Sequence, residues 1–150
     1  MSHNHSFSNS SIFIGIDFGI SHIGVASGQR ITATATPIKT IFAKRGIPDW
    51  QQLDKIIQEW NPSALVVGVP VKMDGSEQWT TKAARKFIIT LKDRYKLPVY
   101  EVDETLTTKE AREKVFAAGG FKAIKKVEID SIAAKLLLES WMAESISSLR

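Results

Sequence analysis

Residues 64–69 read Ala-Leu-Val-Val-Gly-Val and contain no polar side chain. A short continuous apolar run of this kind is typical of a parallel β-strand whose two faces are both covered. A chain with such a strand needs helices on both sides of its sheet. With 150 residues, 43% of them hydrophobic, this chain is large enough to build that arrangement as one domain.

Three β-strands are predicted before this run. Residues 12–18, 23–28 and 32–39 are rich in β-forming residues or alternate apolar with polar ones, and short polar turns separate them. Connections this short join antiparallel neighbours. We therefore expect the chain to open with a three-stranded antiparallel meander.

Helical patterns occur on both sides of the apolar run. Apolar residues recur at helical spacing in residues 50–60, and Pro48 suits the first turn of that helix. A longer helix is predicted from about residue 77 to residue 95, and residues 97–102 are predicted to form a fifth strand.

The last third of the chain is predicted to add two helices. A capping-box pattern at residues 107–110 begins one helix, which ends by Gly119-Gly120. Residues 121–126 are predicted to be a basic loop, and residues 129–137 carry the apolar face of the last helix. The whole order predicts an α/β protein with a five-stranded mixed sheet, a meander followed by β-α-β crossovers, and helices on both faces. This is the order of elements in the RNase H-like fold.

Composition limits the classes of function. The chain has no cysteine, which excludes disulfides, thiolate metal sites and a cysteine nucleophile, and which suits the cytoplasm. No apolar run approaches the roughly 20 residues that cross a bilayer, so no membrane association is expected. The net charge of +4 mildly favours a polyanionic partner such as nucleic acid.

The N-terminal segment is predicted to lie outside the folded domain. Residues 1–11 are polar and lack the basic-then-apolar layout of a signal peptide. We predict a disordered tail over these residues and a single domain over residues 12–150. His3 and His5 lie in the tail and are interpreted as inert rather than as a metal site.

Asp17 is the acidic residue whose position is hardest to explain. It lies among apolar residues of the first predicted strand, and an uncompensated charge buried in a strand carries a large desolvation penalty. One interpretation is that its carboxylate accepts hydrogen bonds from backbone amides of the following turn. The other is that it binds a divalent cation, which would compensate the charge.

Two further acids are predicted to lie near Asp17. Glu104 follows the fifth strand, at the end of the sheet where open α/β sheets place their functional crevice. Asp130 lies at the start of the last helix. Taken alone, each has a structural explanation as a favourable charge or a cap at a helix N-terminus. Taken together, the three carboxylates are the hard oxygen ligands that Mg²⁺ prefers.

The chain resembles the YqgF family, also called RuvX, of Holliday-junction-resolvase-like proteins described as nucleases for the 5′ end of pre-16S rRNA. The resemblance covers residues 13–141. It is carried by Gly-Ile-Asp-Phe-Gly at 15–19 with Gly-Val-Ala at 24–26, Val-Gly-Val-Pro-Val-Lys-Met-Asp-Gly-Ser at 67–76, Asp-Glu-Thr-Leu-Thr-Thr at 103–108 and Ile-Asp-Ser-Ile-Ala-Ala at 129–134.

The resemblance implies a metal-dependent endonuclease. Asp17, Glu104 and Asp130 would be its catalytic acids and would hold one or two Mg²⁺ or Mn²⁺ ions, which activate water for in-line attack on a phosphodiester. The partner would be nucleic acid, with pre-rRNA favoured and branched DNA as the alternative. The sequence departs from the family at Thr105, where an arginine usually follows the glutamate. No acid lies in residues 65–69, so Glu104 must act from one strand further out.

Basic residues near these acids are candidates for contacts to phosphates, which supply affinity without reading sequence. The candidates are Lys72, Arg85, Lys86, Lys122, Lys125 and Lys126. For Arg85 and Lys86 a solvated helix face is an equal explanation. The loop at residues 122–126 is the stronger candidate because it leads directly to Asp130.

Two other classes of function remain open. Ile-Asp-Phe-Gly at residues 16–19 also resembles the opening strand of actin-like ATPases and sugar kinases, but those enzymes enclose their nucleotide between two such domains. A catalytically weak module that binds nucleic acid or a ribosome precursor is the other alternative, and Thr105 favours it.

Overall fold

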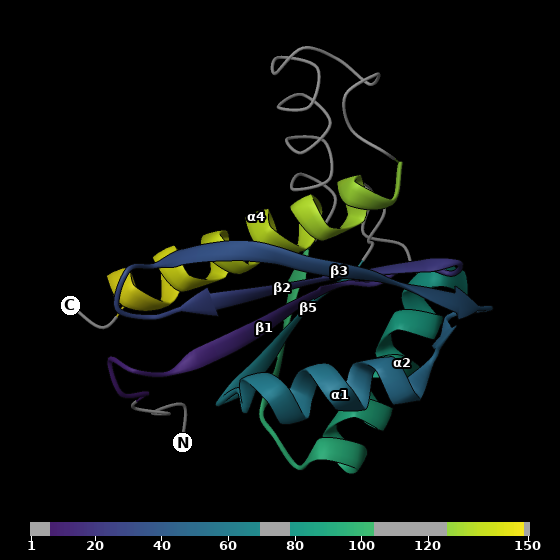
Figure 1. The fold of residues 1–150 in the computed structure, drawn as a ribbon, viewed down its shortest axis with the longest axis horizontal. Coiled ribbons are helices and arrows are strands. Elements are labelled where there is room, and N and C mark those ends of the chain that lie inside the picture. Colours follow the sequence, from purple (N-terminus) through teal and green to yellow (C-terminus); the bar gives the residue numbers. More distant parts are fainter. Residues whose placement is uncertain (1–6, 70–78, 104–125, 149–150) are drawn as a thin grey trace.

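The computed structural model describes residues 7–69, 79–103 and 126–148. A mixed sheet with strand order β4-β3-β2-β1-β5-β6 lies between one helix, α4 (Lys126–Ser148), and two helices, α1 (Trp50–Trp60) and α2 (Trp79–Tyr95) (Figure 1). The predicted α/β class with helices on both faces is confirmed. The predicted count of five strands is wrong, because a two-residue strand, β4 (Ile47–Pro48), adds to the edge of the sheet.

The meander is formed by β1 (Ile12–Asp17), β2 (His22–Gln29) and β3 (Thr34–Lys44), which pair antiparallel in chain order. The predicted end of the third strand at residue 39 is wrong. A β-bulge opposite Val25/Ala26 shifts the register, so that Pro37 is accommodated and β3 continues.

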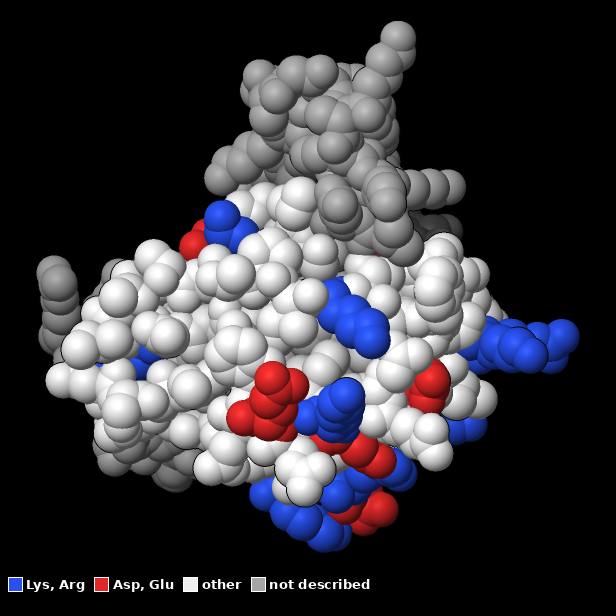
Figure 2. Space-filling model, viewed as in Figure 1, with Lys and Arg blue, Asp and Glu red and all other residues white. Residues whose placement is uncertain are grey.

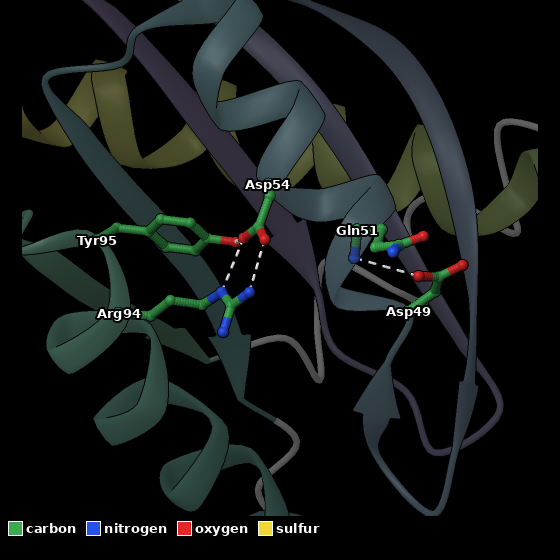
Figure 3. A network of polar contacts seen from close by, with 5 residues as sticks. All are labelled: Asp49, Gln51, Asp54, Arg94 and Tyr95. Atoms are coloured by element: carbon green, nitrogen blue, oxygen red, sulfur yellow. Dashed lines mark hydrogen bonds and ion pairs between the residues drawn. The ribbon is translucent and has the colours of Figure 1, made fainter.

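The strand β4 also corrects the predicted start of the first helix. Pro48 belongs to β4 and pairs with Ala43, so it is not a residue of the first helical turn. The helix α1 begins at Trp50, and Asp49 is its N-cap: the Asp49 carboxylate accepts a hydrogen bond of 3.1 Å from the backbone N–H of Gln51 (Figure 3).

Two crossovers extend the sheet beyond β1. The strand β5 (Ala64–Val69) pairs parallel to β1, and β6 (Val99–Asp103) pairs parallel to β5. All six residues of β5 are buried, as the apolar run predicts. The carboxyl ends of β1, β5 and β6 therefore lie at one end of the sheet.

The side chains alternate between two apolar clusters, one on each face. The cluster against α1 and α2 includes Ile16, Val25, Val67 and Leu91, all buried. The cluster against α4 includes Phe13, Val66, Leu137, Leu138 and Met142. These clusters fix which face each strand residue occupies, and so they fix the face on which Asp17 lies.

The helix α4 differs from its prediction in two respects. It begins at Lys126, so the predicted basic loop is wrong at that residue, because the apolar pattern of the helix already starts at Val127. Its buried residues are also not confined to a single face: consecutive positions 136–138 are all buried, since α4 packs across several strands.

The predicted disordered tail stays a prediction. Of its residues the structure describes 7–11, and the Phe7 ring packs edge-on against Phe13 and Trp141 at centroid distances of 5.0 and 6.5 Å. The helix predicted from residue 107 to Gly119-Gly120 lies outside the described residues. Within the described ranges, no helix combines the length and apolar character that a membrane-spanning segment needs.

Candidate active site

Asp17 is the last residue of β1, and only 7% of its surface is exposed. Residues 13 and 66 belong to the cluster against α4, and alternation along the strand places Asp17 on that same face. Its cross-strand partners are Gly24 on β2 and Gly68 on β5. Neither glycine has a side chain, so no side chain of these two partners competes with the Asp17 carboxylate for this face of the sheet.

The helix α4 approaches this face closely because it lies over glycines. A Cβ atom added to Gly15 would lie 2.8 Å from the Leu138 Cβ, and one added to Gly28 would lie 2.7 Å from the Leu138 Cδ2. A Cβ atom added to Gly24 would lie 2.0 Å from the carbonyl oxygen of Asp130. We call Gly15, Gly24 and Gly28 the glycine trough.

The glycine trough brings Asp17 and Asp130 to the same part of the molecule. Gly24 pairs with Asp17 across the strands and contacts the backbone of Asp130 in the first turns of α4. Asp130 is half-buried. Two of the three predicted acids, which are far apart in the sequence, thus both neighbour Gly24.

The third predicted acid, Glu104, lies outside the described residues. The strand β6 ends at Asp103, which pairs with Val69, and Gly68, the neighbour of Val69, pairs with Asp17. The chain therefore leaves β6 at the same end of the sheet as Asp17. Among residues 7–69, 79–103 and 126–148, no three His, Asp or Glu side chains gather closely enough to hold a metal ion.

The structure describes three of the six basic residues that are predicted to contact phosphates. Arg85 and Lys86 are exposed on α2, on the face of the sheet opposite to α4 (Figure 1). Lys86 lines a groove of about 270 Å³ together with Arg45 and Trp50. Lys126 is the first residue of α4. The other three, Lys72, Lys122 and Lys125, lie outside the described residues.

A bidentate ion pair lies away from these acids, between α1 and α2. Arg94 donates hydrogen bonds of 2.7 and 2.5 Å to the two oxygens of Asp54, and the Tyr95 hydroxyl donates one of 2.6 Å (Figure 3). The hydrogen bonds from Arg94 and Tyr95 lower the pKa of Asp54 to about 2. Burial, and then the bond to Asp54, raise the pKa of Tyr95. This network connects two helices and is structural.

The role of Gly24 was not predicted from the sequence. Gly24 lies inside a strand made mostly of buried residues. A glycine inside a strand weakens it unless another group must come close, and this is the signal that could have identified it.

The match to a known protein family shows to which family this chain belongs. Residues 11–144 match the family described as RuvX, Holliday junction resolvase. The chain belongs to the RuvX family. The match covers every described strand and reaches into the last turns of α4, and the predicted family is confirmed.

Sequence relatives of this RuvX-family chain are similar over almost their whole length. A protein of Legionella pneumophila, named "Putative pre-16S rRNA nuclease", is 52% identical over 134 residues, which are 89% of this chain and 96% of the relative. A protein of the same name from Haemophilus ducreyi is 52% identical over 128 residues, 85% of this chain and 93% of the relative.

Solved structures of resolvases share the fold. Thermus thermophilus RuvC in complex with a Holliday junction substrate has a TM-score of 0.56 at 16% identity, covering 92% of this chain and 97% of RuvC. The fowlpox virus resolvase in complex with Holliday junction DNA has a TM-score of 0.57 at 15% identity, covering 90% and 99%. The predicted RNase H-like fold is confirmed.

Proposed function

We propose that this RuvX-family chain is a metal-dependent endonuclease that hydrolyses phosphodiester bonds in the 5′ region of pre-16S rRNA. The family and the names of the relatives support a nuclease. The observation that carries the proposal is the convergence of Asp17 and Asp130 at Gly24, beside the end of β6 from which the chain continues to Glu104.

The residues present suit a divalent cation. Asp17 and Asp130 provide carboxylate oxygens from two separate elements, and Glu104 follows directly after a third. Mg²⁺ and Mn²⁺ prefer such hard oxygen ligands and keep some of their own water. Gly24 lets the backbone of Asp130 come against β2 next to Asp17.

In this proposal the three acids bind and position, and none of them attacks the substrate. A divalent cation held by these carboxylates would supply activation of water and compensation of negative charge on the phosphate. Hydrolysis would join the water oxygen to phosphorus as the bond to the leaving oxygen breaks, and the proton lost by the water would balance the one taken up by the leaving oxygen. Burial of Asp17 keeps bulk water away from one side of the site, where electrostatic interactions are stronger.

The substrate is argued from the relatives. Proteins about 50% identical are named for pre-16S rRNA, whereas the resolvase structures that hold Holliday junctions are below 20% identity. RNA is therefore the proposed substrate, and branched DNA is the second candidate because the family description names it. Contacts from the basic residues named in the sequence analysis and the cytoplasmic location stay predictions.

The decisive experiment is cleavage of an RNA that spans the 5′ end of 16S rRNA in its precursor. We expect cleavage only with Mg²⁺ or Mn²⁺, and we expect Asp17→Asn to reduce the rate by at least about a thousandfold while RNA binding persists, because Asp17 is assigned to the metal. Glu104→Gln should behave alike, and Thr105→Arg should raise the rate if the departure from the family weakens the site.

The matched control is Asp93→Asn, which removes an exposed carboxylate on α2 and should cleave normally. Cleavage of a Holliday junction but not of RNA would replace the proposed substrate. Binding without metal-dependent cleavage of either would show a binding module. Metal should also raise the melting temperature of the native chain but not of Asp17→Asn, a readout that does not depend on activity.

A further inference from the structure

Two rings lie next to each other at the ends of β2 and β3. His22 pairs with Phe42 across the strands, and their ring centroids are 5.3 Å apart with an interplanar angle of 56°. Phe42 is 63% exposed, although its neighbour Ile41 is fully buried. We call His22 and Phe42 the ring pair.

The ring pair lies on the same face of the sheet as Asp17. Ile23 and Ile41 belong to the cluster against α1 and α2, so alternation along the strands places His22 and Phe42 on the opposite face. His22 is two residues before Gly24, the cross-strand partner of Asp17. The ring pair is therefore the next position on this face along β2, in the direction of the carboxyl end of β1.

Positive charge lies directly beside the ring pair. Two residues after Phe42 on β3 is Lys44, which alternation places on the same face, and it is exposed. Arg45 follows at the turn, is also exposed, and lines the groove with Lys86 on the side of α2. Figure 2 shows Lys and Arg side chains projecting from the end of the molecule where β3 runs into its turn. No Asp or Glu occurs between His22 and Lys44 in the sequence.

An exposed phenyl ring with a basic residue beside it has the chemistry of a single-strand binding site. Proteins that bind single-stranded nucleic acid stack bases on aromatic side chains and track the backbone with positive charge. RNA is recognised most often where its bases are unpaired and open to such stacking. A protein partner would also cover Phe42, but the adjacent Lys44 favours a polyanion.

We propose that the ring pair stacks an unpaired base of the substrate strand beside the Asp17 and Asp130 site, with Lys44 contacting a neighbouring phosphate. This inference rests on the proposed function, because it places the ring pair along the strand that passes the candidate active site. It adds a substrate requirement: the strand must present at least one unstacked base close to the cleaved bond.

Binding in EDTA tests the inference separately from cleavage. The probe is a fluorescein-labelled RNA hairpin with a single-stranded 5′ extension, and its Kd is measured by anisotropy. We expect Phe42→Ala to weaken binding about tenfold, and Phe42→Tyr to retain it, since base stacking on one ring is worth about that factor. The matched control is Ile31→Ala. Ile31 is 69% exposed in the turn between β2 and β3, at the other end of these strands.

The base and the charge are tested by two further comparisons. In a second series, each nucleotide of the single-stranded extension is replaced in turn by an abasic one. At one position this replacement should weaken binding of the native chain. With that RNA, the native chain and Phe42→Ala should have the same Kd. Lys44→Glu should reduce the slope of log affinity against log salt by about 0.7, the value for one phosphate contact to a single strand. Lys92→Glu reverses one positive charge near the end of α2 in the same way and should not alter the slope.

The outcomes separate this inference from the proposed function. Equal affinity of Phe42→Ala and the native chain, together with metal-dependent cleavage, would overturn the ring pair as a stacking site and leave the nuclease intact. An effect of Phe42→Ala on RNA binding without any cleavage would support the ring pair and reject the nuclease. If the native chain binds neither RNA nor branched DNA, both are wrong.

Discussion

On the face of the sheet covered by α1 and α2, strand β1 and the residue after it present Ile14, Ile16 and Phe18, and all three are buried. On the face covered by α4 the same strand presents Gly15 and Asp17 at the intervening positions. The first face is filled by large apolar side chains, so its helices rest on side chains. The second face is partly built of glycine, so its helix approaches the backbone itself.

The two faces of the sheet contribute differently, one mainly to stability and the other to the candidate site. Large apolar side chains removed from water supply most of the free energy of folding. Glycines contribute little to that term, but Gly24 allows the backbone of Asp130 to lie against β2 next to Asp17. We therefore expect substitutions on the first face to change stability, and substitutions on the second face to change the site.

The largest expected loss of stability comes from the first face. Leu91 is fully buried on α2, and Leu91→Ala should lower the free energy of unfolding by about 3 kcal/mol through lost burial and a cavity. Urea denaturation measures this. The cleavage rate of the folded fraction should not change, because Leu91 lies across the sheet from Asp17. The control Ile89→Ala, at a residue 67% exposed on the same helix, should change stability by less than about 0.5 kcal/mol.

The second prediction concerns Gly24→Ala, which should change cleavage as well as stability. Gly24→Ala places a methyl group against the Asp130 carbonyl, which is backbone and cannot turn aside. We expect α4 to shift, at a cost of about 2 kcal/mol, and cleavage to fall about a hundredfold because Asp130 is displaced. Denaturation and single-turnover cleavage measure the two effects.

Gly28→Ala is the matched control for this prediction. It adds the same methyl group on the same strand, but there it meets the ends of the Leu138 and Met142 side chains, which can rotate. Cleavage should therefore survive in Gly28→Ala. Full activity of Gly24→Ala would contradict the assignment of Asp130 to the site.

The smallest expected effect concerns the network between α1 and α2. The pKa of Asp54 is lowered to about 2, below the value of about 3.9 for an unfolded aspartate. Its stabilising effect is therefore complete above about pH 4 and is lost as the pH falls through about 2. Because Asp54 and Arg94 are 42% and 40% exposed, Asp54→Asn should lower the melting temperature by at most about 3 °C at pH 7.

Thermal melts of both proteins between pH 7 and pH 2 test the direction, and their difference should shrink in acid. Asp93→Asn is the comparison, since Asp93 is 87% exposed and its 3.3 Å pair with Lys96 should contribute nothing measurable. A difference that grows in acid would show that Asp54 is not stabilised as a carboxylate.

The sequence predicted correctly those helix and strand ends that are set by residues within or next to the element itself. The bounds of β5 follow from its apolar run. The helix α1 ends at Trp60, and its C-cap, Asn61, adopts a left-handed conformation with φ 45° before Pro62. The continuation of β3 past Pro37 could not be predicted, because it depends on a bulge in β3 itself, where it pairs with β2. Ile38 is the extra residue there, between the pairs Ala26–Pro37 and Val25–Lys39. The strand β4 then follows from a turn with positive φ at Arg45 and Gly46.

The sequence suggested the residues of the candidate site, but not the contacts that bring them to one place. The apolar surroundings of Asp17 in the sequence identified it, and the structure buries it. Its proximity to Asp130 depends on helix α4 crossing Gly24, a contact between segments far apart in the chain, which periodicity cannot show. The roles of Asp17, Glu104 and Asp130 stay predictions until cleavage is measured.

The bulge in β3 near Pro37 also affects whether two molecules can pair through the edge of the sheet. Beyond its two pairs with β4, β3 is the outer strand of the sheet, and an outer strand offers backbone groups to which another chain can add. Pro37 has no N–H to offer, the bulge bends the strand, and exposed Lys39 repels an identical neighbour. The irregularity that sequence patterns could not predict thus protects the folded protein against edge-to-edge aggregation.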